Sequence, residues 1–364
     1  MPSCEFKDEK KCGEHVSLAL VLAWSGKWRP WIHLFLHSCA KNPRVDFLIF
    51  TDQKPLASLP ANVRMIPMTL RDVSQRASAV LGFHVCIPSA YKLCDFKPLY
   101  GLLFADHLVD YSHWGYCDED VFWGDIRKFI TDEHLRDYDL VTSCRCCVVG
   151  QLTILKNVPG VTDLICSAPH LRTQLQDDGI HLLDERVMNN LALAREREGT
   201  LHVLRRQFQT HDVNSEEWTE WANRLELQET GRVLGPLKHG DAVWCEGKLI
   251  HQESAEPFAF YHFGAWKKSW AFLRVPPPPE GIAGWKIGAS GVEFILGPTA
   301  GWTERRYVLR HAAGRVVART RKRVTARVGK LRDLGGRIWR RGWREWRKLT
   351  TVSNSPFGQS KRAG

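Results

Sequence analysis

Short apolar runs alternate with helical patterns along the first half of the chain, and this alternation constrains the fold more than any other feature. Continuous apolar runs at Val16–Trp24 and Asp46–Thr51 predict strands that are covered on both faces. Val63–Met68, His113–Cys117 and Tyr138–Ser143 predict three more. Such alternation predicts an α/β fold, with a mostly parallel mixed sheet and helices on both of its faces.

The intervening segments carry helix signals. Trp28–Ala40 has an apolar helical pattern, and the capping box at Thr69–Asp72 together with Gly82 marks both ends of a second helix. Pro98 is expected to open a helix that runs through Leu108. Thr162–Glu198 is also helical in pattern. Short strand-like pieces follow, at Leu201–Leu204, Ala242–Trp244, Lys248–His251 and Phe258–Phe263.

Composition is that of a globular protein whose charge is uneven. The 364 residues are 44% hydrophobic and 25% charged, and no apolar run reaches the roughly 18 residues of a membrane span. Between Thr303 and Lys348 there are 17 basic residues against three acidic ones, whereas residues 1–302 carry a small negative excess. The predicted domains are an extension (1–14), a main α/β domain (15–275), a Pro/Gly-rich linker with a small β element (276–302) and a basic amphipathic tail (303–364).

Eleven cysteines, scattered and odd in number, favour a reducing compartment over a disulfide framework. Cys144, Cys146 and Cys147 form a tight cluster, but no second Cys/His pair lies at a zinc-finger distance. The cluster lies in Leu140–Val149, which reads as a strand, so small buried thiols are the preferred interpretation over a zinc site. A cytoplasmic location follows from the thiols and from the lack of a cleavable signal.

Asp118 and Asp120 follow a predicted strand directly, in the segment WGYCDEDVFWGDI. In open α/β sheets ligands bind beyond the carboxyl ends of the strands. Two carboxylates spaced by one residue can point at one hard cation, and Mg²⁺ and Mn²⁺ take one or two protein carboxylates together with substrate phosphates. Acidic turns are common in solvent, but the apolar flanks here favour a Mn²⁺ or Mg²⁺ site.

A second segment with metal-binding and phosphate-binding residue types, YHFGAWKKSW, lies about 140 residues later. His262 offers a third ligand, although a histidine in such a place is often only a core residue. Gly264 allows the backbone to approach a phosphate, and Lys267 and Lys268 offer cations for a diphosphate.

This second segment resembles the HFxGxxKPW signature of family 8 glycosyltransferases, with Ser269 where that signature has proline. The resemblance implies that Asp118, Asp120 and His262 bind the metal and that Lys267 contacts the diphosphate of a nucleoside-diphosphate sugar.

The segments SGKWRPWIHLFLHSCAKNPRVDFLIFTD, YKLCDFKPLYG and WGYCDEDVFWGDIRKF are similar to a bacterial family of glycosyltransferase-like proteins, the domain-of-unknown-function family 6625. The resemblance is strong over residues 16–145 and extends weakly to about residue 270. It implies a GT-A-like, Rossmann-like fold and a role in capsule or surface-polysaccharide synthesis, with a glycan or lipid-linked glycan as acceptor.

Further site residues are inferred from where GT-A enzymes hold their substrates. Donor contacts are expected from the residues before the metal-binding strand and from the exits of the first two strands: Lys92, Asp95, Lys97, Trp24, Lys27 and Asp52. Asp184 and Glu185 are the expected acceptor-side carboxylates, either of which is a candidate general base. Each acid has an alternative role at a helix N-terminus. Retaining and inverting outcomes both stay open.

The predicted activity is therefore sugar transfer from a nucleoside-diphosphate sugar. A sugar-nucleotide nucleotidyltransferase is the main rival, but Trp24–Arg29 is too poor in glycine to cradle a triphosphate. A non-catalytic module that binds glycan or nucleic acid would be expected to lack one of the four metal and phosphate residues, and all four are present.

The tail has its own signature. Val324, Val328, Leu331, Leu334 and Ile338 recur at helical spacing among many arginines, with three tryptophans following. A basic amphipathic helix of this kind predicts peripheral attachment to the anionic inner face of a membrane. A solvated tail is the alternative, and nucleic-acid binding is disfavoured because no recognition motif is present.

Overall fold

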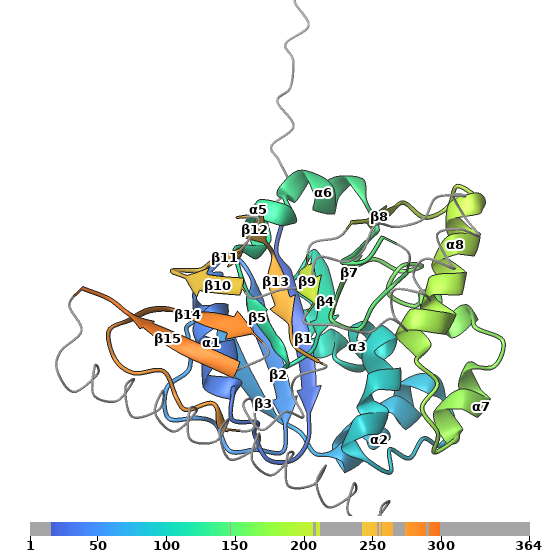
Figure 1. The fold of residues 1–364 in the computed structure, drawn as a ribbon. Coiled ribbons are helices and arrows are strands. Elements are labelled where there is room, and N and C mark those ends of the chain that lie inside the picture. Colours follow the sequence, from blue (N-terminus) through green and yellow to red (C-terminus); the bar gives the residue numbers. More distant parts are fainter. Residues whose placement is uncertain are drawn as a thin grey trace, which may run out of the picture. The chain divides into compact units, whose positions relative to one another are not determined.

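A seven-stranded sheet forms the centre of the described chain (Figure 1). The computed structural model describes residues 16–145, 147–206, 209–211, 242–252, 255, 257–264, 274–288 and 291–298. The strands of this sheet, in spatial order, are β3 (Val63–Pro67), β2 (Asp46–Thr51), β1 (Leu18–Trp24), β4 (His113–Cys117), β7 (Leu152–Lys156), β6 (Leu140–Thr142) and β8 (Val203–Arg205).

The sheet is mostly parallel. β1 pairs in parallel with both β2 and β4, β2 with β3, and β6 with β8, whereas β7 runs antiparallel to β4 and β6. The strand order reverses at β1, because β2 and β3 continue on one side of it and β4 lies on the other. The carboxyl ends of β1 and β4 therefore border the switch point at which α/β sheets bind ligands.

Helices cover both faces of the sheet, as the sequence predicts. One apolar core lies between the sheet and a large helical group, in chain order α2 (Leu70–Leu81), η1 (Ala90–Leu99), α3 (Tyr100–Leu103), α4 (Ala105–Leu108), η2 (Leu164–Ser167), α7 (Leu171–Gln176), η3 (Leu183–Met188) and α8 (Asn189–Arg197). The other core lies under α1 (Ile32–Ala40), α5 (Ile126–Phe129) and α6 (Asp132–Asp137).

Strand alternation explains how one strand serves both cores. Along β1, Ala19 and Val21 belong to the first core and Leu18 and Leu20 to the second. The ends of α2 are as predicted, because Thr69 and Asp72 form the capping box and Gly82 adopts a left-handed φ of 72°.

Two helical predictions are wrong in detail. The segment expected to form one helix from Pro98 to Leu108 is helical from Ala90 onward and is divided into η1, α3 and α4. The region 162–198 is broken into four pieces. Pro169 forces the preceding Ala168 into an extended conformation, and the Asp177 side chain accepts a hydrogen bond from the Gly179 N–H in a turn.

Strand predictions also need correction between residues 140 and 156. β6 ends at Thr142, so the Cys144–Cys147 region is a loop and not the end of a strand. The loop leads into β7, which the sequence reading missed. Cys144 and Cys147 lie with their Sγ atoms 3.6 Å apart, and Cys146 lies outside the described residues.

Two smaller sheets flank the centre. In one, β13 (Phe260–His262) lies between β5 (Val121–Trp123) and β9 (Gln209–His211). The other is antiparallel, in the order β12 (Pro257–Phe258), β11 (Lys248–His251), β10 (Ala242–Cys245), β14 (Ile282–Gly288) and β15 (Gly291–Leu296). The small β element predicted for residues 276–302 corresponds to β14 and β15, and β14 pairs with β10. Trp244 stacks on Trp285, with their ring centroids 3.9 Å apart.

The described residues belong to the first of two compact units, Met1–Gly301 and Trp302–Gly364. The predicted tail and the residues 1–14 lie outside the described residues, so the predicted domain limits stay predictions. None of the helices in the described part of the chain has both the length and the apolar character that a membrane crossing requires.

Candidate active site

Two acidic residues stand at the carboxyl end of β4, beside the switch point. All five residues of β4 are buried, and the strand ends where Asp118 begins the turn into β5. The Asp120 residue is 1% exposed, whereas the Asp118 side chain is 24% exposed. The structure thus places both carboxylates at the end of this strand, as predicted, with Asp120 buried and Asp118 partly exposed to solvent.

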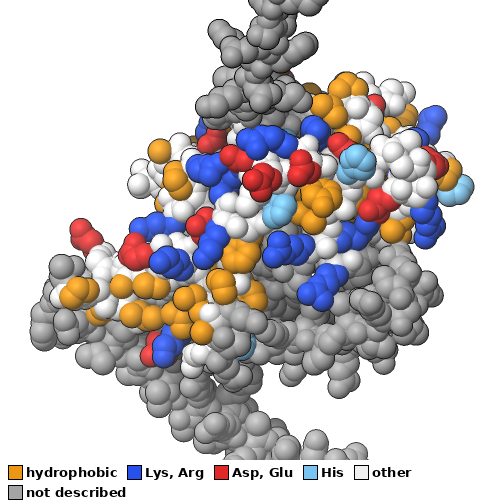
Figure 2. All heavy atoms as spheres, turned by 90° about the horizontal axis from the view of Figure 1, so that it is seen from above, with side chains coloured by type: hydrophobic (Ala, Val, Ile, Leu, Met, Phe, Trp, Pro, Cys, Tyr) orange, Lys and Arg blue, Asp and Glu red, His pale blue; other side chains and the backbone are white. Residues whose placement is uncertain are grey.

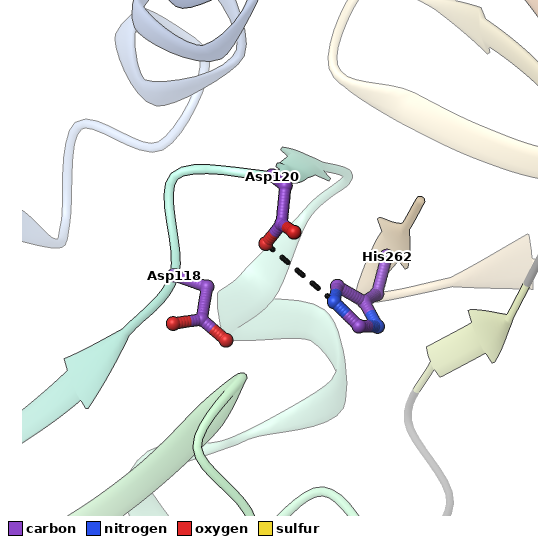
Figure 3. A group of neighbouring side chains, drawn as sticks. All are labelled: Asp118, Asp120 and His262. Atoms are coloured by element: carbon purple, nitrogen blue, oxygen red, sulfur yellow. Dashed lines mark ion pairs between the residues drawn. The ribbon is translucent and has the colours of Figure 1, made fainter. Parts of the chain in front are cut away.

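His262 is brought to this turn by strand pairing. β13 runs antiparallel to β5 with His262 opposite Val121, and the Phe263 N–H donates to the Asp120 carbonyl at 3.1 Å. The His262 Nε2 atom lies 3.5 Å from Asp120 Oδ1 (Figure 3). One ligand atom from each of Asp118, Asp120 and His262 fits within 4.8 Å of the others, and this is the one such group of three found among the described residues.

Gly264 leaves room for the imidazole. A Cβ atom at this position would lie 2.6 Å from both Cε1 and Nε2 of His262, and 3.6 Å from Asp120 Oδ2. Any side chain at residue 264 would therefore displace the ring from the carboxylate. Gly264 thus makes room for the His262 ring, while its predicted role in letting the backbone approach a phosphate stays a prediction.

Lys97 contacts a candidate metal ligand. Its Nζ atom donates to Asp118 Oδ1 at 2.5 Å and to the Gly150 carbonyl at 3.0 Å, and the residue is 7% exposed. Burial lowers the pKa of Lys97, but the Asp118 and Asp184 carboxylates outweigh it and hold the pKa well above its usual value. Lys97 is thus a permanent positive charge beside Asp118.

Asp184 and Glu185 approach Lys97 from η3, which is a π-helix. The residue before this helix, Leu182, has a left-handed backbone conformation with φ of 52°. A Cβ atom at Gly150 would lie 2.7 Å from both Asp184 Oδ2 and Lys97 Nζ, so Gly150 is the residue that lets these two side chains approach. Sequence reasoning missed Gly150, because only the fold brings its loop between them.

Burial dominates the electrostatics of this acidic pair. It raises the pKa of Asp184 to about 6, although Lys97 opposes the change. Burial and the neighbouring Asp184 charge raise the pKa of Glu185 to about 8. Two carboxyls with separated pKa values near neutrality are the pattern of acid and base groups in active sites.

Lys92 and Asp95 form a different arrangement. Both side chains are fully buried, and Lys92 Nζ donates to Asp95 Oδ2 at 2.9 Å and to the carbonyls of Gln174 and Gly179. The His181 N–H donates to Asp95. The pair thus joins η1 to the loop before η3, and a direct contact with a sugar donor, as the sequence predicts for both, would require this network to open.

The exits of β1 and β2 meet at Asp52. Its carboxylate accepts hydrogen bonds from Ser25 Oγ at 2.6 Å and from the Gly26 N–H at 3.0 Å. Trp24 stacks against Trp28 with ring centroids 6.1 Å apart, while Lys27 is exposed. Trp24, Lys27 and Asp52 therefore border one edge of the switch point together. Lys267 lies outside the described residues.

Residues 20–269 match the family described as "Family of unknown function (DUF6625)". No curated protein is significantly similar in sequence.

Three solved glycosyltransferases are among the structures that this chain is similar to. The galactosyltransferase LgtC, solved with donor and acceptor sugar analogues, has 12% identity and a TM-score of 0.40, with 71% of this chain and 93% of that chain covered. Mouse xyloside xylosyltransferase 1 has 9% identity and a TM-score of 0.39, with 68% and 97% covered. GlyE of Streptococcus pneumoniae has 14% identity and a TM-score of 0.30, with 49% and 43% covered.

Proposed function

The chain belongs to the DUF6625 family of unknown function, and we propose that it is a metal-dependent glycosyltransferase that uses a nucleoside-diphosphate sugar. One observation carries the proposal. Two carboxylates and an imidazole, contributed by segments 142 positions apart in the chain, gather within 4.8 Å at the switch point of a mostly parallel sheet.

The residues present fit a hard or borderline divalent cation. Oxygen ligands from Asp118 and Asp120 suit Mg²⁺ and Mn²⁺, and the imidazole of His262 favours Mn²⁺ between the two. Lys97 balances the charge of one of the two carboxylates, so the site keeps a net demand for positive charge. When bound, the ion supplies charge neutralisation for a leaving nucleoside diphosphate.

The donor is assigned to the edge of the sheet where β1, β2 and β4 end. Trp24 and Asp52 are proposed to hold the base and ribose, with Lys27 at the rim, and Lys267 to contact the diphosphate. Lys97 acts on the donor side through Asp118, whose carboxylate it orients. Lys92 and Asp95 keep the supporting segment in place.

Asp184 is proposed as the group that handles the acceptor's proton in an inverting transfer. It is buried, ionisable near neutral pH and next to Lys97, which would stabilise its anionic form. Glu185 holds its proton more tightly and serves as a hydrogen-bond donor to the acceptor. In a retaining transfer the leaving phosphate would accept the proton, and Asp184 would then only position the acceptor.

The proposal also covers the acceptor of the sugar and the place where the protein acts. We infer a glycan or lipid-linked glycan acceptor of surface-polysaccharide synthesis, met on the cytoplasmic side, with residues 303–348 binding an anionic membrane surface. In co-sedimentation with anionic liposomes, the full chain should pellet with the liposomes, and a version ending at Gly301, which keeps β14 and β15, should stay in the supernatant. Equal partitioning of the two would contradict the membrane role.

The activity is tested by thermal shift with Mn²⁺ and a panel of nucleoside diphosphates. Stabilisation that needs metal and one nucleotide together is expected, and it should disappear in Asp120→Asn. Stabilisation by a nucleoside triphosphate but by no diphosphate would instead favour a nucleotidyltransferase. Stabilisation by DNA or RNA alone would favour a binding module.

A further inference from the structure

A pocket of about 390 Å³ lies away from the candidate active site, between the end of α1 and the start of α5. Because β1 and β2 are parallel, α1 returns the chain to the amino ends of the strands, whereas Asp118 and Asp120 stand at the carboxyl end of β4. The two sites thus lie at opposite edges of the central sheet. Helices α5 and α6 are at the top of Figure 1, and Figure 2 views that side, where basic side chains gather with a few acidic ones between them.

Four of the residues that line the pocket are cationic and one is acidic: Lys41, Arg44, Arg127, Lys128 and Asp125. Their acidic partners are few. Asp132 is shared by Arg44, at 2.8 Å, and by Arg127, and Glu246 pairs with Lys41 at 2.6 Å. No ion pair of Lys128 is found within the described segments. The pocket therefore carries more positive than negative charge.

Arg127 is the most informative of these residues. It is only 8% exposed, and although Nη2 bonds to Asp132, neither Nε nor Nη1 has a hydrogen-bond acceptor. Burial and the charge of Arg44 lower the pKa of Arg127, against the opposing effect of Asp132. A buried guanidinium with unused donors is costly, and an oxyanion next to it would supply both acceptors and countercharge.

The walls of the pocket are held rigidly by Asn42, which is 3% exposed. Its amide donates to the carbonyls of Ser38 and Gly124, and its oxygen accepts from the Ile126 N–H at 2.9 Å. These bonds join the end of α1 to the start of α5. The pocket is therefore preorganised, which lowers the entropic cost of binding a ligand.

We propose that this pocket binds a phosphate group, supplied either as inorganic phosphate or as a phosphate ester. Arginine forks match phosphate oxygens, and Lys128 adds a mobile point charge at the rim. The volume lies within the range of small-ligand sites and exceeds what a lone phosphate fills, so a phosphomonoester such as glycerol 3-phosphate should bind at least as well.

The test compares sodium phosphate, glycerol 3-phosphate and sodium chloride at equal ionic strength, without divalent metal, by thermal unfolding of the full chain. Saturating phosphate or phosphate ester should raise the unfolding temperature by about 3 °C over chloride. An effect of glycerol 3-phosphate alone would identify the ester as the ligand, and equal effects would identify the phosphate group itself.

Three variants locate the effect without touching the buried Arg127. Lys128→Gln and Arg44→Gln should each weaken the apparent phosphate affinity about tenfold. Asp125→Asn keeps the helix cap, because asparagine caps as well as aspartate, yet removes the one acid of the lining, so it should tighten binding about threefold. Lys54→Gln, on an exposed segment, is the neutral control.

The proposal is overturned if phosphate and chloride act alike, or if Lys128→Gln, Arg44→Gln and wild type respond equally. Asp120→Asn should respond to phosphate as wild type does. Loss of the response in that variant would place the phosphate in the candidate active site and also overturn the proposal. The nucleotide panel is run with Mn²⁺ and this test without divalent metal, so failure of one proposal is distinguishable from failure of the other.

Discussion

Two buried lysines, five positions apart in η1, show how differently the same residue type is used. Lys92 is enclosed completely, and its three hydrogen bonds go to Asp95 and to two backbone carbonyls. Lys97 also makes a short ion pair, but its partner Asp118 is partly open to solvent and stands in a group of carboxylates with a histidine nearby.

The difference separates a structural network from a candidate site. Around Lys92 every charge is matched within the chain, so the arrangement needs nothing from outside. Around Lys97 one cation faces Asp118 and Asp184, and Asp120 lies close to Asp118, so negative charge is in excess. Charge left in excess in a semi-enclosed place indicates binding of a cation.

Removing Asp120, one of the candidate metal ligands near Lys97, should have the largest effect on activity. We expect Asp120→Asn to lower sugar transfer, or hydrolysis of the donor, about a thousandfold, which corresponds to the several kcal/mol that a metal ion contributes. Stability should change by no more than about 1 kcal/mol, since a buried charge is removed. Glu119→Gln, in the same turn, is the matched control and should stay active. An active Asp120→Asn would remove the metal-dependent assignment.

Removing the lysine of the closed network should affect stability instead. Lys92→Met leaves Asp95 buried without its cation, and denaturant titration should show a loss of about 3 kcal/mol. Turnover by the folded fraction should stay within a few-fold of wild type. If activity vanished while stability held, Lys92 would contact the donor as the sequence alone predicts, and the contrast between the two lysines would fail.

The pH dependence of stability sharpens the contrast further. The pKa values of Asp184 and Glu185 are raised, so the folded chain keeps protons that the unfolded chain releases between about pH 4 and pH 8. The unfolding free energy therefore falls as pH rises through this window. Glu185→Gln should match wild type near pH 5 and exceed it by about 2 kcal/mol above pH 8. Thermal unfolding in EDTA measures this, with Glu133→Gln as control, and a parallel offset at both pH values would refute it.

The smallest effect concerns metal affinity. Lys97→Met removes a positive charge that competes with a cation for Asp118, so Mn²⁺ should bind about tenfold more tightly, as titration calorimetry would show. Turnover should nonetheless fall, because Asp118 loses its fixed orientation. Lys92→Met should leave the Mn²⁺ affinity unchanged. Equal shifts in the two variants would mean that the lysines are equivalent.

Local pattern explains which elements the sequence could predict. β1, β2 and β4 are buried on both faces, so each appears as an unbroken apolar run, and the acids at the end of β4 stand out against it. The capping box of α2 depends on four adjacent residues, so the start of this helix could also be predicted from the sequence. β7 was missed because Leu152–Lys156 follows a cysteine-rich loop whose Val148 and Val149 resemble a strand.

The site was predictable in its ligands but not in its surroundings. Asp118, Asp120 and His262 could be joined by the chemistry of a metal and by family resemblance, and the structure brings them together. The contacts of Lys97 depend on how closely η1 and α3 pack against β4, where a Cβ at Gly101 would meet the Trp114 ring at 2.3 Å. Such packing joins residues that are far apart in the sequence. The sequence alone therefore does not show that Lys92 and Lys97 have different roles.

The pairing of β13 with β5 has a mechanical consequence. The contact between Asp120 and His262 closes a loop of more than 140 residues, and the two strands that hold it are only three residues long. A cation coordinated there would act as a cross-link between the middle of the chain and a distant later segment. The central sheet has its own ladder of bonds, so chelation should first loosen β13 and leave β1, β2 and β4 intact.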